Sequence, residues 1–185
     1  MHYMMNFSRW LLGSGLLATT LSFAIYGISQ QASADNDGSY GRSALPTSTV
    51  YTAECGACHM AYPANFLPKA SWQLMLGQLD QHFGDNAELD QANKQIISDY
   101  LMQHAADSQG PWQNPRILRR LEGTPLRITE TGYFLRKHDE IPQRMVKGNP
   151  EVGSFSQCNA CHKGAEKGLF NEHTVSVPGY GRWDD

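Results

Sequence analysis

The sequence Cys55-Gly56-Ala57-Cys58-His59 decides how this chain can fold, and Cys158-Asn159-Ala160-Cys161-His162 repeats its pattern near the other end. Both read C-x-x-C-H, the attachment pattern for haem c. Two thiols separated by two residues can add to the two vinyl groups of one haem, and the following histidine is then held under the iron. The pattern predicts two covalently bound haems c. The attachment residues would be Cys55, Cys58, Cys158 and Cys161, with His59 and His162 as proximal ligands.

Two other chemistries also use C-x-x-C pairs, namely redox dithiols and zinc sites. A zinc ribbon separates its two pairs by roughly 15–20 residues, whereas Cys58 and Cys158 are 100 positions apart. All four cysteines of the chain lie in the two motifs, and a histidine follows each pair. These features favour haem attachment over both alternatives.

Residues 1–34 have the pattern of a secretory signal peptide. Arg9 supplies the positive end, the run from Trp10 to Ser29 carries no charge, and Ala32-Ser33-Ala34 is a cleavage signal. Export agrees with haem attachment, which in bacteria takes place outside the inner membrane, so the sequence predicts a periplasmic protein. The uncharged run is also long enough for an uncleaved membrane anchor, which stays an alternative.

Cleavage after Ala34 would leave 151 residues and remove one arginine, which changes the formal charge from −3 to −4. This length suits one medium domain or two small ones. A segment rich in Gly and Pro around Gly110-Pro111 predicts a boundary, with one haem domain over 35–108 and another over 109–185. The mild acidity gives no reason to expect nucleic-acid binding.

The first half predicts a helix that faces the haem. Trp72, Met75, Leu79 and His82 recur at spacings of three and four, with Ser71 as N-cap and an end at Phe83-Gly84. His82 is therefore the candidate distal ligand of the first iron, and two methionines compete with it, Met60 and Met75.

A second helix is predicted from a cap at Asp85-Asn86 to His104. We expect His104, in the last turn, to have a structural role rather than to bind iron, because an imidazole suits the dipole at a helix C-terminus.

The second half has less helical periodicity, so we expect it to owe more of its order to the haem. Residues 127–134 suggest a short strand or an extended loop. His138 and His173 are both candidates for the second distal site, with Met145 or an open site as further alternatives. A run of basic residues fits a solvated face, haem propionate binding or docking of an acidic partner. It contains Arg116, Arg119, Arg120, Arg127, Arg136 and Lys137.

The longer strings around both motifs resemble the dihaem cytochromes c. They include residues 51–63, Leu67-Pro68, Ser71-Trp72, 82–87, 128–131, 137–141 and 158–162. The resemblance implies a mainly α fold, with an N-terminal domain like a class I cytochrome c and a loop-rich C-terminal haem domain. It also implies bis-His ligation of both irons, with His82 and His138 as the distal ligands. Family members pass electrons to small periplasmic haem proteins or sit beside b-type membrane cytochromes.

These observations favour an electron carrier in the periplasm, not an enzyme. Two six-coordinate haems can relay single electrons without bond chemistry. A haem enzyme, such as a peroxidase or a small-molecule reductase, needs an open or labile distal position with acid–base groups nearby. A gas-binding module needs one five-coordinate haem. The histidines available for both distal sites argue against these two alternatives.

Overall fold

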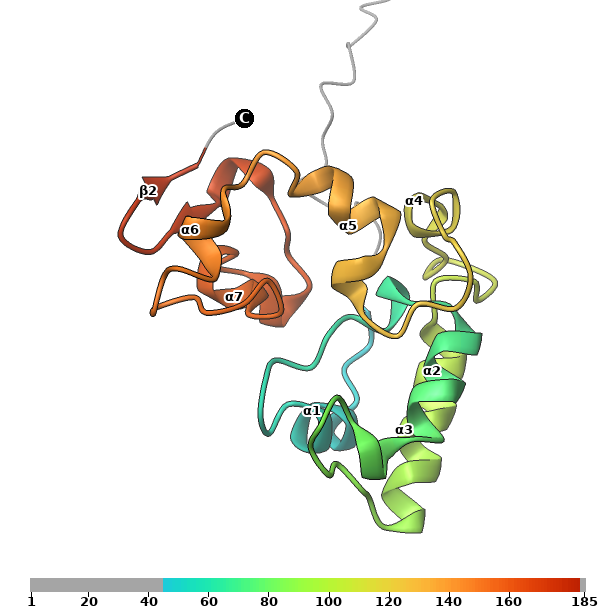
Figure 1. Ribbon diagram of the computed structural model, residues 1–185. Coiled ribbons are helices and arrows are strands. Elements are labelled where there is room, and N and C mark those ends of the chain that lie inside the picture. The colour runs from blue at the N-terminus through green and yellow to red at the C-terminus, as the bar shows by residue number, and fades with distance from the viewer. Residues whose placement is uncertain (1–44, 184–185) are drawn as a thin grey trace, which may run out of the picture. The chain divides into compact units, whose positions relative to one another are not determined.

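Helices and turns make up most of the regular structure in residues 45–183, which are the residues that the computed structural model describes (Figure 1). The predicted signal peptide, residues 1–34, lies outside them. No helix within 45–183 is both long and apolar enough to cross a membrane. The mainly α fold class is confirmed, whereas the likeness of the first half to a class I cytochrome c stays a prediction.

The first half holds the longest helix among the described residues. Its elements are α1 (Thr49–Cys55), η1 (Ala64–Phe66), α2 (Lys69–Leu76), η2 (Leu79–Gln81) and α3 (Gln91–His104). Ser48 caps α1, because its side chain accepts a hydrogen bond from the amide of Tyr51 at 3.2 Å. Both α1 and α2 pack against α3.

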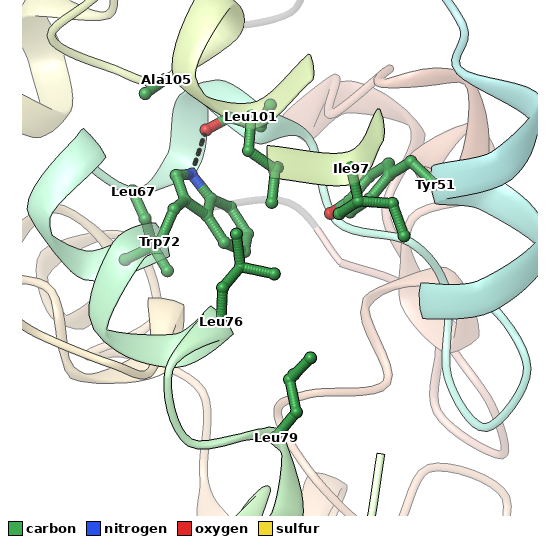
Figure 2. Close-up of a cluster of buried hydrophobic side chains, with 9 residues drawn as sticks. Tyr51, Leu67, Trp72, Leu76, Leu79, Ile97, Leu101 and Ala105 are labelled. Carbon is green, nitrogen blue, oxygen red and sulfur yellow. Dashed lines mark hydrogen bonds between the residues drawn. The ribbon is translucent and has the colours of Figure 1, made fainter. Parts of the chain in front are cut away.

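A hydrophobic cluster lies where these three helices meet (Figure 2). Trp72 is its largest side chain, and the indole N–H donates to the carbonyl of Ala64 at 2.7 Å. Ile97 and Leu101 of α3 are at most 1% exposed, and burying such a side chain stabilises the fold by about 1.5–3 kcal/mol. The cluster gives the first half a core made of side chains alone. It also contains Tyr51, Leu67, Leu76, Leu79 and Ala105.

The helix predicted from the N-cap Ser71 to an end at Phe83-Gly84 is wrong at both ends. Helix α2 begins after Pro68, and Ser71 lies buried inside it. The first turn is capped from a distance, because the amide of Lys69 donates to the carboxylate of Asp107 at 2.8 Å. The helix ends at Leu76 with Gly77 as its C-cap, and His82 follows the separate turn η2.

The second helix begins later than predicted. Asp90 caps it by accepting from the amide of Asn93 at 2.9 Å, whereas Asn86 forms a local turn by accepting from the amide of Glu88. His104 does lie in the last turn of α3, where it is buried and its Nδ1 donates to the carbonyl of Tyr100 at 2.7 Å. These contacts support the structural role expected for it.

The second half is less regular, as predicted. Its longest helix has six residues, against fourteen for α3. The two strands pair antiparallel, with Ser176 opposite Arg182. The elements are α4 (Pro115–Leu118), η3 (Ile128–Glu130), α5 (Gly132–Lys137), α6 (Gln143–Val146), α7 (Cys158–Cys161), η4 (Ala165–Lys167), η5 (Glu172–Thr174), β1 (Ser176–Val177) and β2 (Gly181–Arg182).

The strand or extended loop expected over residues 127–134 is wrong, since η3 and α5 occupy this segment. Thr131 decides the local structure. Its hydroxyl accepts from the amide of Phe134 at 3.2 Å, which is the hydrogen bond of a helix N-cap.

The segment proposed as a boundary is tied to the first half. The amide of Ala106 donates to the carbonyl of Leu67, and the side-chain amide of Asn114 donates to the carbonyl of Asn65. Ala106 and Asn114 are both buried. The division at 108/109 stays a prediction about organisation.

Candidate haem-binding sites

The first motif follows directly from α1. Cys55 is the last residue of that helix, whereas Cys58 lies beyond the turn, so the two cysteines are not carried by one helix. A side chain at Gly56 would collide with the carbonyl of Thr52, which explains the glycine between the cysteines. His59 is oriented by its own neighbour, because Nδ1 donates to the carbonyl of Met60 at 2.7 Å.

His82 faces His59 across this site. The two ring centroids are 6.3 Å apart and the ring planes differ by 25°. Met60 is buried at 7% exposure, and Met75 packs against the hydrophobic cluster. Of the three competing side chains, His82 is therefore the one that we take as the distal candidate.

The second motif lies on α7, which carries both Cys158 and Cys161. His162 follows the helix, and its ring centroid is 6.2 Å from that of His138, with the planes at 72°. Nδ1 of His138 donates to the carbonyl of Phe134 at 2.9 Å, and the His138 ring stacks on Phe134 at 3.9 Å. His138 is thus held in place by the helix that precedes it.

A cavity of about 370 Å³ contains the second pair. Both thiols of the second motif, His138 and His162 line it, and so does the exposed His173. Its walls are mainly apolar and come from distant parts of the chain, with Phe66 of the first half among them. Other aromatic side chains that line it are Tyr133, Phe134, Phe155, Phe170 and Trp183.

Both histidine pairs fit a haem iron between them. An imidazole nitrogen binds a transition metal at about 2 Å and lies about 1.1 Å from its ring centroid, so two axial rings have centroids roughly 6.2 Å apart. The separations of 6.3 and 6.2 Å match this value. Among the described residues, Nδ1 of His162 is buried without a hydrogen-bond partner, unlike Nδ1 of His59 and of His138.

Three of the four thiols are not set up as redox nucleophiles. Burial and then the charge of Glu54 raise the pKa of Cys55 to about 11, and burial raises the pKa of Cys158 to about 11. Burial also raises the pKa of Cys161. Reactive C-x-x-C motifs lower the pKa of a thiol instead. This result disfavours the dithiol alternative.

One imidazole of each pair is held in the neutral form that binds metals. Burial, followed by the proximity of His138, lowers the pKa of His162 to about 4. Burial also lowers the pKa of His82, with His59 and Arg127 adding to the effect and Asp85 opposing it. A neutral imidazole offers a lone pair to iron, so burial favours ligation at both sites.

Tyr62 connects the two sites. Its ring stacks on His59 with centroids 4.7 Å apart and planes at 19°, and its hydroxyl donates to the carbonyl of Ser156 at 2.8 Å. Burial and the nearby Cys158 raise the pKa of this hydroxyl to about 12, which keeps the donor proton in place. Ser156 lies two residues before the second motif, so one side chain spans from the first proximal candidate to the second motif.

The sequence patterns missed several residues that the fold brings to these sites. Phe66 has no periodicity or motif that marks it. Tyr62 lies in the string 51–63 and Arg127 in the basic run, but neither pattern indicated the contacts that the fold gives these two residues. Phe155 and Phe170 flank the second motif, and their proximity in sequence was the one available signal.

A mainly helical chain with two C-x-x-C-H motifs, each beside a second histidine at iron-spanning distance, has the features of a c-type cytochrome with two haems. A family model described as dihaem cytochrome c matches residues 51–170. The chain belongs to the dihaem cytochrome c family, and its cofactors are two haem c groups.

Solved structures agree with this assignment. The diheme cytochrome type c from Shewanella baltica OS155 is 53% identical, with a TM-score of 0.63, and the match covers 76% of this chain and 100% of that chain. The diheme cytochrome c from Rhodobacter sphaeroides is 46% identical, with a TM-score of 0.61, and the match covers 69% of this chain and 100% of that chain. No curated protein matches the chain. Membership of this family points to an electron carrier rather than an enzyme, and cytochromes c are typically exported proteins.

Proposed function

We propose that this protein relays single electrons in the periplasm through two bis-His haems c. His59 and His82 would hold the first iron, and His138 and His162 the second. The observation that carries the proposal is the pair of imidazole separations, 6.3 and 6.2 Å, each beside one attachment motif. Haem supplies the one-electron iron couple when it is bound.

The protein's own contribution is to fix the imidazoles. Nδ1 of His59 and Nδ1 of His138 each donate to a backbone carbonyl, which leaves the other ring nitrogen of each histidine for the iron. A ligand oriented in this way needs little reorganisation when the charge of the iron changes. Tyr62 adds a route of bonded and packed atoms from His59 to the chain beside the second motif.

The periplasmic location rests on the signal sequence over residues 1–34 and on the place of haem attachment in bacteria. The resemblance to the family suggests the partners: a small periplasmic haem protein, a b-type membrane cytochrome, or both. The basic segment that starts at Arg116 is a candidate docking surface for an acidic partner, because opposite charges steer encounter. Nucleic acid is not an expected partner.

Absorption and low-temperature EPR spectra of the purified ferric protein test the ligation. We expect two low-spin haems and no band near 695 nm, the band typical of Met–iron bonding. The two EPR signals should differ in shape. Nearly parallel imidazoles, as at 25°, give a rhombic signal, and nearly perpendicular ones, as at 72°, give a signal with one large g value.

Single substitutions assign each signal. His82→Ala should remove the rhombic signal and His138→Ala the other one, and each change should let one haem of two bind carbon monoxide. His173→Ala and His104→Ala are the matched controls, and both should leave two low-spin haems. The distal assignments would be reversed if His173→Ala opened the second haem while His138→Ala did not. An unchanged low-spin signal in His82→Ala would remove that histidine from the first site.

A further inference from the structure

The loop that carries His82 has little regular structure to support it. His82 follows the three-residue turn η2, and its carbonyl accepts from the amide of Asp85 at 3.1 Å. No α-helix contains it, in contrast to the cysteine pair on α7. An iron ligand must nevertheless be held within a fraction of an ångström of its productive position. Something outside this turn must therefore restrain the imidazole.

Phe83, the next residue, has an unusual backbone. Its φ is +55°, and among residues 45–183 it is the one residue other than glycine with a positive φ. A side chain with a Cβ atom disfavours this left-handed region, and such residues persist where the surrounding structure determines them and where function needs them. Glycine would relieve the strain, so the aromatic ring itself must contribute something at this position.

The Phe83 ring lies between His82 and a cation. It contacts the His82 imidazole edge-on, with centroids 4.8 Å apart and planes at 63°. The guanidinium carbon of Arg127 lies 3.8 Å from the centroid of the same ring. Phe83 is 43% exposed even with this contact. A cation over an aromatic ring at this distance is attractive.

Arg127 belongs to the second half of the chain. It is the N-cap residue of η3, with extended backbone. Its Nε lies 3.6 Å from Oε1 of Glu130, an exposed ion pair that orients the side chain. Arg127, at the start of η3, therefore contacts the Phe83 ring, and the Phe83 ring contacts His82, the distal candidate of the first site.

We propose that Arg127 and Phe83 are positioning residues that hold His82 against the first iron. The inference rests on the proposed function, because it takes His82 as a ligand. Arg127 also places a fixed positive charge beside the first site, and such a charge disfavours the extra positive charge of ferric iron. The second half of the protein thereby sets both the ligand occupancy and the potential of the first haem.

The test uses the holoprotein and measures carbon monoxide binding to the ferrous form. Arg127→Gln should increase the rate of carbon monoxide binding at the first haem by about two- to fivefold. Loss of an exposed cation–π contact corresponds to a factor of this size. The potential of that haem should fall. Arg127→Lys keeps the positive charge, so the potential of the first haem should equal that of the wild type. The rate of carbon monoxide binding should return only in part to the wild-type value. Arg136→Gln is the matched control, since Arg136 lies 6.0 Å from the Tyr133 ring, far in sequence from His82.

Phe83→Gly separates a role for the ring from a role for the backbone. If only the backbone mattered, glycine would relieve the strained φ and slow carbon monoxide binding. We expect the opposite, namely faster binding at the first haem and a changed rhombic EPR signal. Unchanged binding and potential in Arg127→Gln, together with slower binding in Phe83→Gly, would overturn the proposal. His82→Ala keeps the outcomes distinguishable, because a low-spin, unreactive first haem in that variant would refute the ligation itself.

Discussion

The two halves of the protein achieve order in different ways. The first half has a hydrophobic cluster of buried side chains that includes Trp72 and, from α3, Ile97 and Leu101 (Figure 2). The second half consists of helices of three to six residues around a cavity of about 370 Å³ that both of its thiols and both of its central histidines line. Short helices are marginal without packing partners. The comparison leads us to expect that the second half depends more on its haem for order than the first half does.

The largest effect on local stability should therefore follow from loss of the second haem. In Cys158→Ala/Cys161→Ala, amide protection in residues 133–177 should fall until the local stability is about zero, while helix α3 keeps its protection. Hydrogen exchange followed by mass spectrometry measures both regions at once. The matched variant is Cys55→Ala/Cys58→Ala, in which α3 should still be protected. Equal loss of protection in α3 and in residues 133–177 would contradict the comparison.

The next effect concerns the core of the first half. Ile97→Ala should lower the free energy of unfolding by about 2–5 kcal/mol, because it leaves a cavity at a fully buried position. Ile96→Ala is the control on the same helix, since Ile96 is 46% exposed and should cost much less. Denaturant unfolding of the two variants measures the difference. Similar costs at both positions would show that the cluster is not the core of the first half.

A smaller effect should follow from breaking the connection between the halves. Tyr62→Phe removes the hydrogen bond to Ser156 but keeps the stacking on His59, so we expect a loss of about 1 kcal/mol and slower exchange of electrons between the haems. Tyr180→Phe changes a tyrosine that is 48% exposed and serves as the control. Thermal unfolding and flash photolysis are the measurements. If Tyr62→Phe equalled the wild type in both stability and the rate of electron exchange, Tyr62 would have no role in connecting the two haem sites.

The smallest effect should come from the exposed basic residues. Arg119→Gln/Arg120→Gln should slow electron transfer with an acidic haem partner by about two- to fivefold at low salt, and the difference should shrink as salt screens the charges. We expect the potential of the first haem to stay the same. Stopped-flow rates at several salt concentrations decide between docking and a solvated face. Rates equal to wild type at every salt concentration, with an unchanged second haem, would favour the solvated face.

Local sequence determined the chemistry of this protein. The spacing of the residues within each C-x-x-C-H motif dictated the cofactor. Thioether attachment needs two cysteines at that spacing and requires no residue from elsewhere in the chain. The weak helical periodicity after residue 109 also predicted an irregular second half, since regular helices need a repeating apolar face.

Tertiary contacts decided what the local patterns could not. Helix α2 begins at Lys69 because Asp107, far along the chain, accepts the hydrogen bond of its first turn. His138 lies against His162 while His173 is exposed, and the sequence distance of each histidine from the motif did not dictate that choice. Arg127 reaches Phe83 across 44 positions of sequence. Each of these contacts joins residues that only the packed chain brings together, because a side chain responds to its neighbours in space and not to its neighbours in sequence.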